Sequence, residues 1–187
     1  DRAPEVKTLR RKLTRLSRIG GAERLGRLVA QRRVKSLGQA LGMLYIDGHV
    51  RVYHGKRSLP KAHVTRLRIS MPATTDYWVN DQRGDPLFVV TAEANAALTK
   101  VLPTLLQDVR GVVGERRVTI VFDRGGWSPK LFQKLIAQDF DILTYRKGRV
   151  PPVAEADFKE HKSKLDGREV RYQLADQQVS LLKGKLL

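Results

Sequence analysis

The stretch RVTIVFDRGGWSPKLFQKL, residues 117–135, decides the expected fold more than any other part of the chain. Residues 118–122 of this stretch form an apolar, β-branched run of the kind found at the buried centre of a sheet. Ser128 then suits a helix N-cap and Pro129 the first helical position, which predicts a helix over 128–138. Asp123 closes the strand just before two glycines, where open α/β sheets place ligand-binding groups.

On both sides of this stretch, segments with the two-residue periodicity of strands are interspersed with segments that have the periodicity of helices. A helix is expected over 93–110, where apolar residues follow one side although Pro103 argues against one straight helix. Strands are expected over five segments: 43–46, 50–53, 66–71, 86–91 and 140–146. The order of strands, helix, central strand, helix and strand predicts a mixed α/β sheet flanked by helices.

Residues 1–40 form a basic segment with twelve Lys and Arg, three acids and a net charge of +9, about half of the formal +17. Apolar residues recur at steps of three and four from Val6 to Ile19, which predicts one face of a helix. Gly20-Gly21 interrupts it before a second helical piece. We therefore expect a basic helical arm whose Arg10, Arg11 and Arg15 contact DNA phosphates; a solvated basic helix pair is the alternative.

A charge of +17 exceeds what solubility requires and favours a polyanionic partner, foremost nucleic acid. Charge alone does not separate a DNA enzyme from a merely basic or ribosome-associated protein. The absence of Cys excludes disulfides, thiolate zinc sites and cysteine nucleophiles, and four isolated His argue against a histidine metal cluster. No apolar run is long enough to span a membrane, and no export signal opens the chain, so a cytoplasmic, nucleoid-associated protein without membrane contact is expected.

The character of the sequence changes after Pro151-Pro152, where a charged stretch leads to two alternating segments, 168–174 and 177–182. These predict the start of a β-rich insertion. The expected organisation is therefore a basic helical arm at 1–40, a partial catalytic core at 41–150 and the start of an insertion at 151–187.

Asp47 and Asp123 are the candidate metal ligands, because each follows an expected strand. If the two strands are neighbours, the carboxyl groups should lie about 4–8 Å apart and hold Mg²⁺ or Mn²⁺, which prefer oxygen ligands. Such metals serve phosphoryl displacement without a nucleophilic side chain. Two alternatives stay open: Asp47-Gly48 is also a hairpin-turn signal, and Asp123 is also suited to a structural cap. Three further acids are interpreted as turn formers: Asp76, Asp81 and Asp85.

Several long motifs make the sequence resemble bacterial insertion-sequence transposases of the DDE class. They are YIDGHVRVYHG at 45–55, LPKAHVTRLRISMPATTDYWVND at 59–81, VFDRGGWSPKLFQKL at 121–135 and FDILTYRKG at 140–148. The resemblance extends over essentially the whole chain. It implies a ribonuclease H-like fold in which Asp47 and Asp123 are the first two acids of a catalytic triad.

The resemblance also implies a third acid, a Glu on a helix beyond the β-rich insertion, in a motif similar to Arg-Trp-x-x-Glu-Asn. This sequence does not contain that motif, so the triad is expected to be incomplete and its third acid to lie beyond Leu187. In a more compact arrangement the Glu follows the second Asp by about 35 residues. Glu155 and Glu160 stand 32 and 37 residues after Asp123, within a charged segment that also suits a solvated surface.

The function predicted on this basis is metal-dependent cleavage of DNA at transposon ends, followed by strand transfer into target DNA. DNA is the expected partner, with a homodimer on DNA as an arrangement left open. Four cations beside the expected catalytic edge are predicted to hold phosphates: Arg124, Lys130, Arg146 and Lys147. The alternatives are a nuclease or resolvase of the same fold and a non-catalytic DNA-binding remnant of a transposase.

Overall fold

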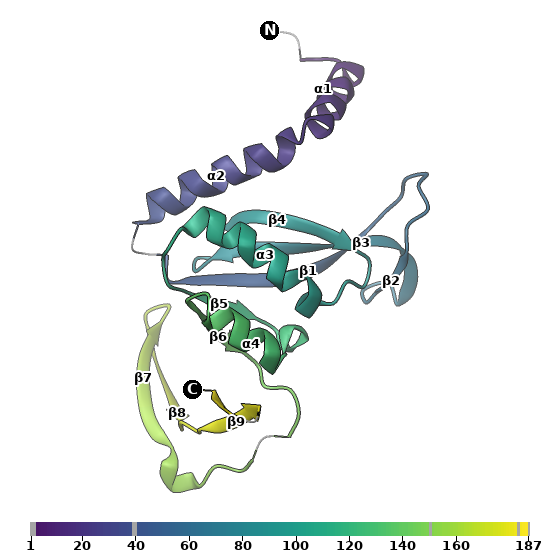
Figure 1. Cartoon of the computed structure of the whole chain (residues 1–187). Helices are drawn as coiled ribbons and strands as arrows, with labels where there is room; N and C mark the ends of the chain where they lie inside the picture. The colour runs from purple at the N-terminus through teal and green to yellow at the C-terminus, as the bar shows by residue number, and fades with distance from the viewer. Residues whose placement is uncertain (1–2, 39–40, 150, 183, 187) are drawn as a thin grey trace. The chain divides into compact units, whose positions relative to one another are not determined.

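The computed structural model describes residues 3–38, 41–149, 151–182 and 184–186, with no side-chain description from 179 onward. By its contacts the chain divides into two compact units, Asp1–Tyr145 and Arg146–Leu187 (Figure 1). The two expected N-terminal helices fall in the same unit as the main sheet. The expected three-part organisation with boundaries at 40 and 150 remains a prediction.

The main sheet of the first unit contains six strands: β1 (Met43–Val52), β2 (Lys61–Val64), β3 (Ile69–Asp81), β4 (Pro86–Glu93), β5 (Val118–Phe122) and β6 (Phe140–Thr144). They are ordered β2-β3-β1-β5-β6, and β4 also pairs with β3. The pairs β1–β3, β2–β3 and β3–β4 are antiparallel, whereas β1–β5 and β5–β6 are parallel. An antiparallel β4-β3-β1 meander extended by two parallel strands is the arrangement of a ribonuclease H-like sheet, which confirms the expected fold class.

The core lies between one face of this sheet and two helices, α3 (Leu98–Val113) and α4 (Pro129–Ile136). β5 buries Val118, Ile120 and Phe122 at alternate positions, because successive strand residues point to opposite faces. α4 begins where the sequence predicts, since the Ser128 side chain accepts a hydrogen bond from the Leu131 N–H and Pro129 follows the cap. α3 continues through Pro103 and begins at Leu98 rather than at 93.

The basic segment forms two helices, α1 (Val6–Arg18) and α2 (Gly21–Leu37), as predicted. None of the α1 residues is buried. α2 packs on α3 and β4, burying Ala30 and Val34. Its Arg27 pairs with Asp108 of α3 at 3.0 Å. α2 is thus part of the folded body, and α1 alone has the character of an arm.

The strands of the meander differ from those expected from sequence. β1 runs without a break from Met43 to Val52, although two strands separated by Asp47-Gly48 were expected. The strand predicted over 66–71 is confirmed only in its second half: residues 65–68 form the turn between β2 and β3, and β3 begins at Ile69. β3 extends through residues 74–81 because β1 and β4 pair with both of its edges there.

The second unit contains a short 3₁₀ turn, η3 (Glu155–Asp157), and two antiparallel pairs: β7 (Lys159–Leu165) with β8 (Arg168–Leu174), and β9 (Val179–Leu182) with β10 (Gly184–Leu186). β8 and β9 were predicted, and β7 was missed. Asp166 and Gly167 join β7 to β8 with positive φ angles of 48° and 77°, as a two-residue type I′ hairpin requires. Among the described residues, no helix is long and apolar enough to cross a membrane.

Candidate active site

Asp47 lies inside β1, at the point where β1 loses its pairing with β5. Ile46 is aligned with Phe122 as the last β1–β5 pair, while β1 continues past Asp47 and pairs it with Trp78 of β3. The hairpin interpretation of Asp47-Gly48 is therefore wrong. The Asp47 side chain is exposed, and its Oδ1 accepts a hydrogen bond from the Gly48 N–H at 2.9 Å.

Asp123 follows the last residue of β5 and caps a short 3₁₀ turn, η2 (Arg124–Gly126). Its Oδ1 accepts a hydrogen bond from the Gly125 N–H at 2.9 Å. Its carbonyl oxygen accepts one from the Thr144 hydroxyl of β6 at 3.1 Å. The expected cap is therefore present: the Gly125 N–H binds the side chain of Asp123, and the Thr144 hydroxyl and the Gly126 N–H bind its carbonyl oxygen. Asp123 itself stays exposed.

The strand register places these two acids directly after the last paired residues of two neighbouring strands. Because Ile46 and Phe122 are paired in parallel neighbouring strands, Asp47 and Asp123 are the next residues of the same alignment. Paired residues of adjacent strands project to the same face, and the strands are about 4.8 Å apart. Ile46 is buried on the helix-covered face, so alternation directs Asp47 to the opposite, open face, while Asp123 directly follows the end of the neighbouring strand β5.

Tyr77 of β3 lies beside the residue that follows Asp47. It is aligned with Gly48 in β3, and a Cβ on Gly48 would lie only 2.7 Å from the Tyr77 ring. Burial raises the pKa of Tyr77, and the negative charge of Asp123 raises it further. Sequence reasoning missed Tyr77, because it is separated from Asp47 by thirty positions in the chain.

The two glycines after Asp123 have separate steric roles. A Cβ on Gly125 would lie 2.8 Å from the Asp123 Oδ1 atom. A Cβ on Gly126 would lie 2.4 Å from the Phe122 ring, which itself lies 6.3 Å from the Phe132 ring of α4. Gly125 thus leaves room for the carboxylate, and Gly126 lets η2 pack on the core.

The two carboxylates fit a hard divalent cation such as Mg²⁺, which binds proteins through one or two carboxylates and keeps positions for water and phosphate oxygens. Each acid has one oxygen engaged by a backbone N–H, and no other hydrogen bond to its carboxylate is found within the described residues. The described part of the chain holds no group of three or more His, Cys, Asp or Glu suited to a metal ion. The role of Asp47 and Asp123 as metal ligands remains a prediction.

Two of the predicted phosphate-binding cations are exposed in the first unit near Asp123: Arg124 in η2 and Lys130 in the first turn of α4. Arg146 and Lys147 begin the second unit. Arg10, Arg11 and Arg15 are exposed on α1. Glu155 lies in η3 and Glu160 in β7, both exposed in the second unit, so their relation to the acid pair remains a prediction.

The acids interpreted as turn formers have different positions. Asp85 does lie in the β3–β4 turn, and Asp81 caps it by accepting hydrogen bonds from the Arg83 and Asp85 N–H groups at 2.9 and 3.1 Å. Asp81 is also fully buried and pairs with Arg33 of α2 at 3.1 Å. Asp76 was interpreted wrongly: it lies within β3, where it is buried.

Asp76 instead orients Arg51 of β1. The Arg51 Nε lies 2.9 Å from one carboxylate oxygen of Asp76, and a guanidinium nitrogen donates to the other at 3.3 Å. The Thr91 hydroxyl of β4 also donates to Asp76, at 2.8 Å. These bonds engage both of its carboxylate oxygens, so Asp76 serves as an anchor rather than as a free metal ligand.

The family profile described as "Transposase protein" matches residues 1–187. No curated protein sequence matches the chain. Among solved structures, the Mos1 mariner paired end complex with Mn is similar at 12% identity and a TM-score of 0.39, over 64% of this chain and 40% of that one. The piggyBac transposase synaptic complex with hairpin DNA is similar at 14% identity and a TM-score of 0.41, over 76% and 35%.

A second Mos1 structure, the transposase paired-end complex with left transposon end, has 15% identity and a TM-score of 0.37, over 63% of this chain and 39% of that one. The chain spans about 40% of the length of these solved chains or less. The fold is accordingly assigned from strand order and direction rather than from these alignments.

Proposed function

We propose, from the premise that this chain belongs to the transposase protein family, that it carries part of a catalytic core for metal-dependent cleavage of DNA at transposon ends and strand transfer into target DNA. The observation that supports the proposal is the pairing of Ile46 with Phe122, because Asp47 and Asp123 are the next residues along these two neighbouring parallel strands. A soluble polyanion is the natural partner of a chain with a formal charge of +17.

In this proposal Asp47 and Asp123 hold Mg²⁺ or Mn²⁺ through the carboxylate oxygens that no backbone group engages. The bound cation would supply charge for phosphoryl displacement by water or by a DNA 3′-hydroxyl. The protein itself contributes by holding the two metal-binding carboxylates in place. Strand pairing fixes Asp47, and the Gly125 N–H and Thr144 hydroxyl fix Asp123.

The cations nearest to this edge would position DNA rather than read its sequence. Arg124 follows Asp123 directly, and Lys130 stands in the first turn of α4, so both are placed to contact backbone phosphates. Arg146 and Lys147 continue the chain after β6 in the same proposed role. On α1, Arg10, Arg11 and Arg15 would add affinity without sequence preference.

The third acid decides between an active enzyme and a DNA-binding protein without catalysis. Glu155 and Glu160 are candidates within the chain, and a nuclease or resolvase would use the same two aspartates. Phosphoryl transfer depends strongly on positioned metal cations, and each carboxylate ligand helps to hold them, so two carboxylates without a third should support little strand transfer.

The test is to incubate the chain with end-labelled transposon-end DNA and Mn²⁺, with Asp123→Asn and Asp85→Asn as matched variants. Asp85 is an exposed turn acid of the same sheet, so its variant controls for the loss of one negative charge. We expect any cleavage to vanish in Asp123→Asn and to persist in Asp85→Asn. Cleavage that survives in Asp123→Asn would refute the catalytic role of the pair.

If the chain binds DNA but cuts nothing, the DNA-binding alternative is favoured. Repeating the assay with Glu155→Gln and Glu160→Gln identifies the third acid when cleavage is seen. Loss of cleavage in one of these variants, with folding unchanged, would assign that residue to the triad. Cleavage without strand transfer would favour the nuclease or resolvase alternative.

A further inference from the structure

The segment 48–75 is the longest stretch of this sequence without an acidic residue. It contains the end of β1, the β1–β2 loop, β2 and the start of β3. Three of the four His of the chain lie in it, as do six cations: Arg51, Lys56, Arg57, Lys61, Arg66 and Arg68. This acid-free segment forms a second basic region, separate in sequence from the N-terminal helices.

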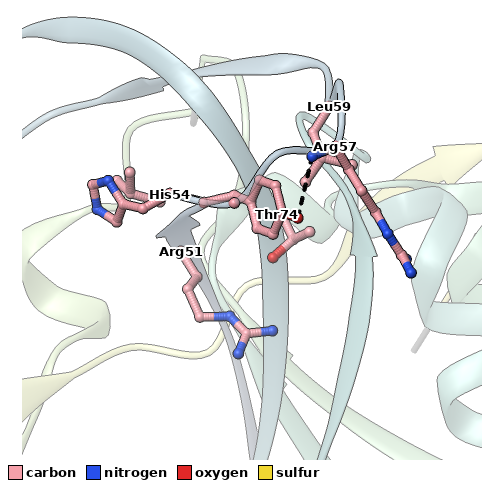
Figure 2. Close-up of a pocket in the computed structure, with 8 residues that line it drawn as sticks. Arg51, His54, Arg57, Leu59 and Thr74 are labelled. Carbon is pink, nitrogen blue, oxygen red and sulfur yellow. Dashed lines mark hydrogen bonds between the residues drawn. The ribbon is translucent and has the colours of Figure 1, made fainter. Parts of the chain in front are cut away.

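The acid-free segment lines an open pocket of about 520 Å³. Its lining combines cations with apolar and aromatic groups, and the residues that matter here are Arg51, Tyr53, His54, Arg57, Leu59 and Thr74. In Figure 2 the side chains of Arg51, His54 and Arg57 extend in different directions around the pocket. No acidic residue is among the described residues that line it.

The Tyr53 side chain is held in place by its own loop. Its ring covers Gly55 so closely that a Cβ there would lie 2.1 Å from the Tyr53 hydroxyl. The hydroxyl accepts a hydrogen bond from the Arg57 backbone N–H at 3.4 Å (Figure 2). The Tyr53 N–H donates to the Pro72 carbonyl at 2.8 Å, which continues the pairing of β1 with β3. The aromatic group is therefore largely ordered before any ligand binds.

The cations of the pocket are not equally free. Arg51 is paired with the buried carboxylate of Asp76. Within the described residues neither His54 nor Arg57 forms an ion pair. Arg57 thus has an uncompensated charge, and its backbone is bound to the Tyr53 hydroxyl, so the pocket offers a cation and an aromatic ring to a ligand that carries both an anionic group and a flat apolar group.

The pocket and the acid pair share one face of β1. Asp47 and Arg51 are four residues apart in this strand, so alternation places both on the open face, about 13 Å apart at 3.3 Å per residue. A DNA strand places consecutive phosphates about 3.4 Å apart along the duplex axis. A strand whose phosphate lies at the acid pair can therefore reach the pocket within a few nucleotides.

We propose that this pocket binds one unpaired nucleotide of a DNA strand, with the base against Tyr53 and Leu59 and the phosphate at Arg57. The proposal rests on the proposed function, because it requires DNA at the open face. A lone phosphate would make no contact with the apolar wall of the pocket. A base within a duplex has both faces stacked on adjacent bases, so it could not stack on Tyr53. The volume lies in the range of sites that hold small organic groups, and stacking on an aromatic ring is a common mode of single-strand binding.

The test compares the affinity of the full chain for two labelled DNAs without added metal: a blunt duplex and the same duplex with a short single-stranded overhang. Arg57→Gln and Tyr53→Leu remove the proposed contacts. Arg66→Gln is the matched control, because Arg66 belongs to the same acid-free segment but does not line the pocket. Thermal unfolding of each variant is measured alongside.

We expect the wild-type chain to prefer the overhang by about tenfold, the magnitude of one stacked base. Arg57→Gln and Tyr53→Leu should abolish this preference, whereas Arg66→Gln should weaken both complexes and keep the ratio. A wild-type chain that binds both DNAs equally, or an Arg57→Gln variant that keeps the preference, would overturn the pocket and leave the proposed function standing. A wild-type chain that binds neither DNA would overturn both.

Discussion

The two faces of the sheet have opposite chemistry although they share the same strands. The covered face of β1 and β5 consists of apolar side chains such as Leu44, Ile46 and Ile120, all buried beneath α3 and α4. The open face of the same strands carries Asp47, Arg51 and the adjoining Asp123. One strand therefore contributes to folding and to the site at alternate positions, and substitutions on the two faces should separate stability from binding.

The largest expected effect is a loss of stability on the covered face. Ile120→Ala removes a fully buried side chain from the central strand, which should cost about 3–4 kcal/mol of unfolding free energy. Val121→Ala, the adjacent substitution on the open face, should cost about 1 kcal/mol, because Val121 is only half-buried. Denaturant unfolding measures both, and equal losses would contradict the division into a covered and an open face.

The next largest effect on stability is expected for a substitution at Gly126, which tests the packing of η2, with Gly111 as its control. Gly126→Ala should destabilise the fold by about 1–3 kcal/mol, because the added Cβ meets the buried Phe122 ring. Gly111→Ala should be neutral or stabilising by up to about 1 kcal/mol, since Gly111 lies in α3 with nothing within 4 Å of the added atom. A neutral Gly126→Ala would show that η2 does not pack on the core.

Titration of Asp81 should make the stability of the fold depend on pH. Burial acts to raise the pKa of Asp81, but hydrogen bonds from the Arg83 N–H, Arg33 and the Asp85 N–H outweigh it and lower the pKa below its ordinary value. A carboxyl group with a lowered pKa in the folded state stabilises the fold at neutral pH. This contribution is lost as pH falls below about 4 and through the folded-state pKa.

Asp81→Asn should therefore lower stability at pH 7 and flatten the acid limb of a stability–pH profile. Asp85→Asn is the matched control, because Asp85 is exposed and binds the same Arg33. Its effect should be small, as for other surface ion pairs. An unchanged acid limb in Asp81→Asn would mean that Asp81 does not anchor α2 to the β3–β4 turn.

The smallest expected effect on stability comes from removing residues 1–19, because α1 contributes no buried residue. DNA affinity should respond instead. Each phosphate contact adds about 0.9 to the slope of log affinity against log salt, and α1 carries six cations, so the slope should fall by several units. An unaltered slope would show that the charges of α1 stay in solvent.

Local sequence patterns predicted the structure correctly where long-range packing favours the same conformation. They failed where pairing with a strand distant in sequence favours another one. The cap at Ser128 and the apolar run of β5 were sufficient to locate β5 and α4. The same Asp-Gly dipeptide occurs at 47–48 and 166–167, yet only the second forms a turn. At 47–48 the chain stays extended because β1 continues to pair with β3 past Asp47. The residues of β3 are about thirty positions away in the sequence, so no local pattern predicts this pairing.

Charged residues were a second source of wrong sequence predictions. β7 was missed because all of its residues are exposed and mostly polar, so its strand depends on pairing with β8 rather than on an apolar face. Asp76 was taken for a turn residue because acids are rare inside strands, and only the folded chain brings Arg51 and Thr91 to it. The two site aspartates were identified from position and resemblance, whereas Tyr77 required the strand register.

The central claim is that Asp47 and Asp123 act as one metal site, and Mn²⁺ affinity in a double-mutant cycle tests it most directly. Titration of the wild-type chain, Asp47→Asn, Asp123→Asn and the double variant gives the coupling between the two positions. We predict that either single substitution removes most of the affinity and that the second adds little. Unchanged affinity in both single variants, or losses that simply add, would contradict a shared site.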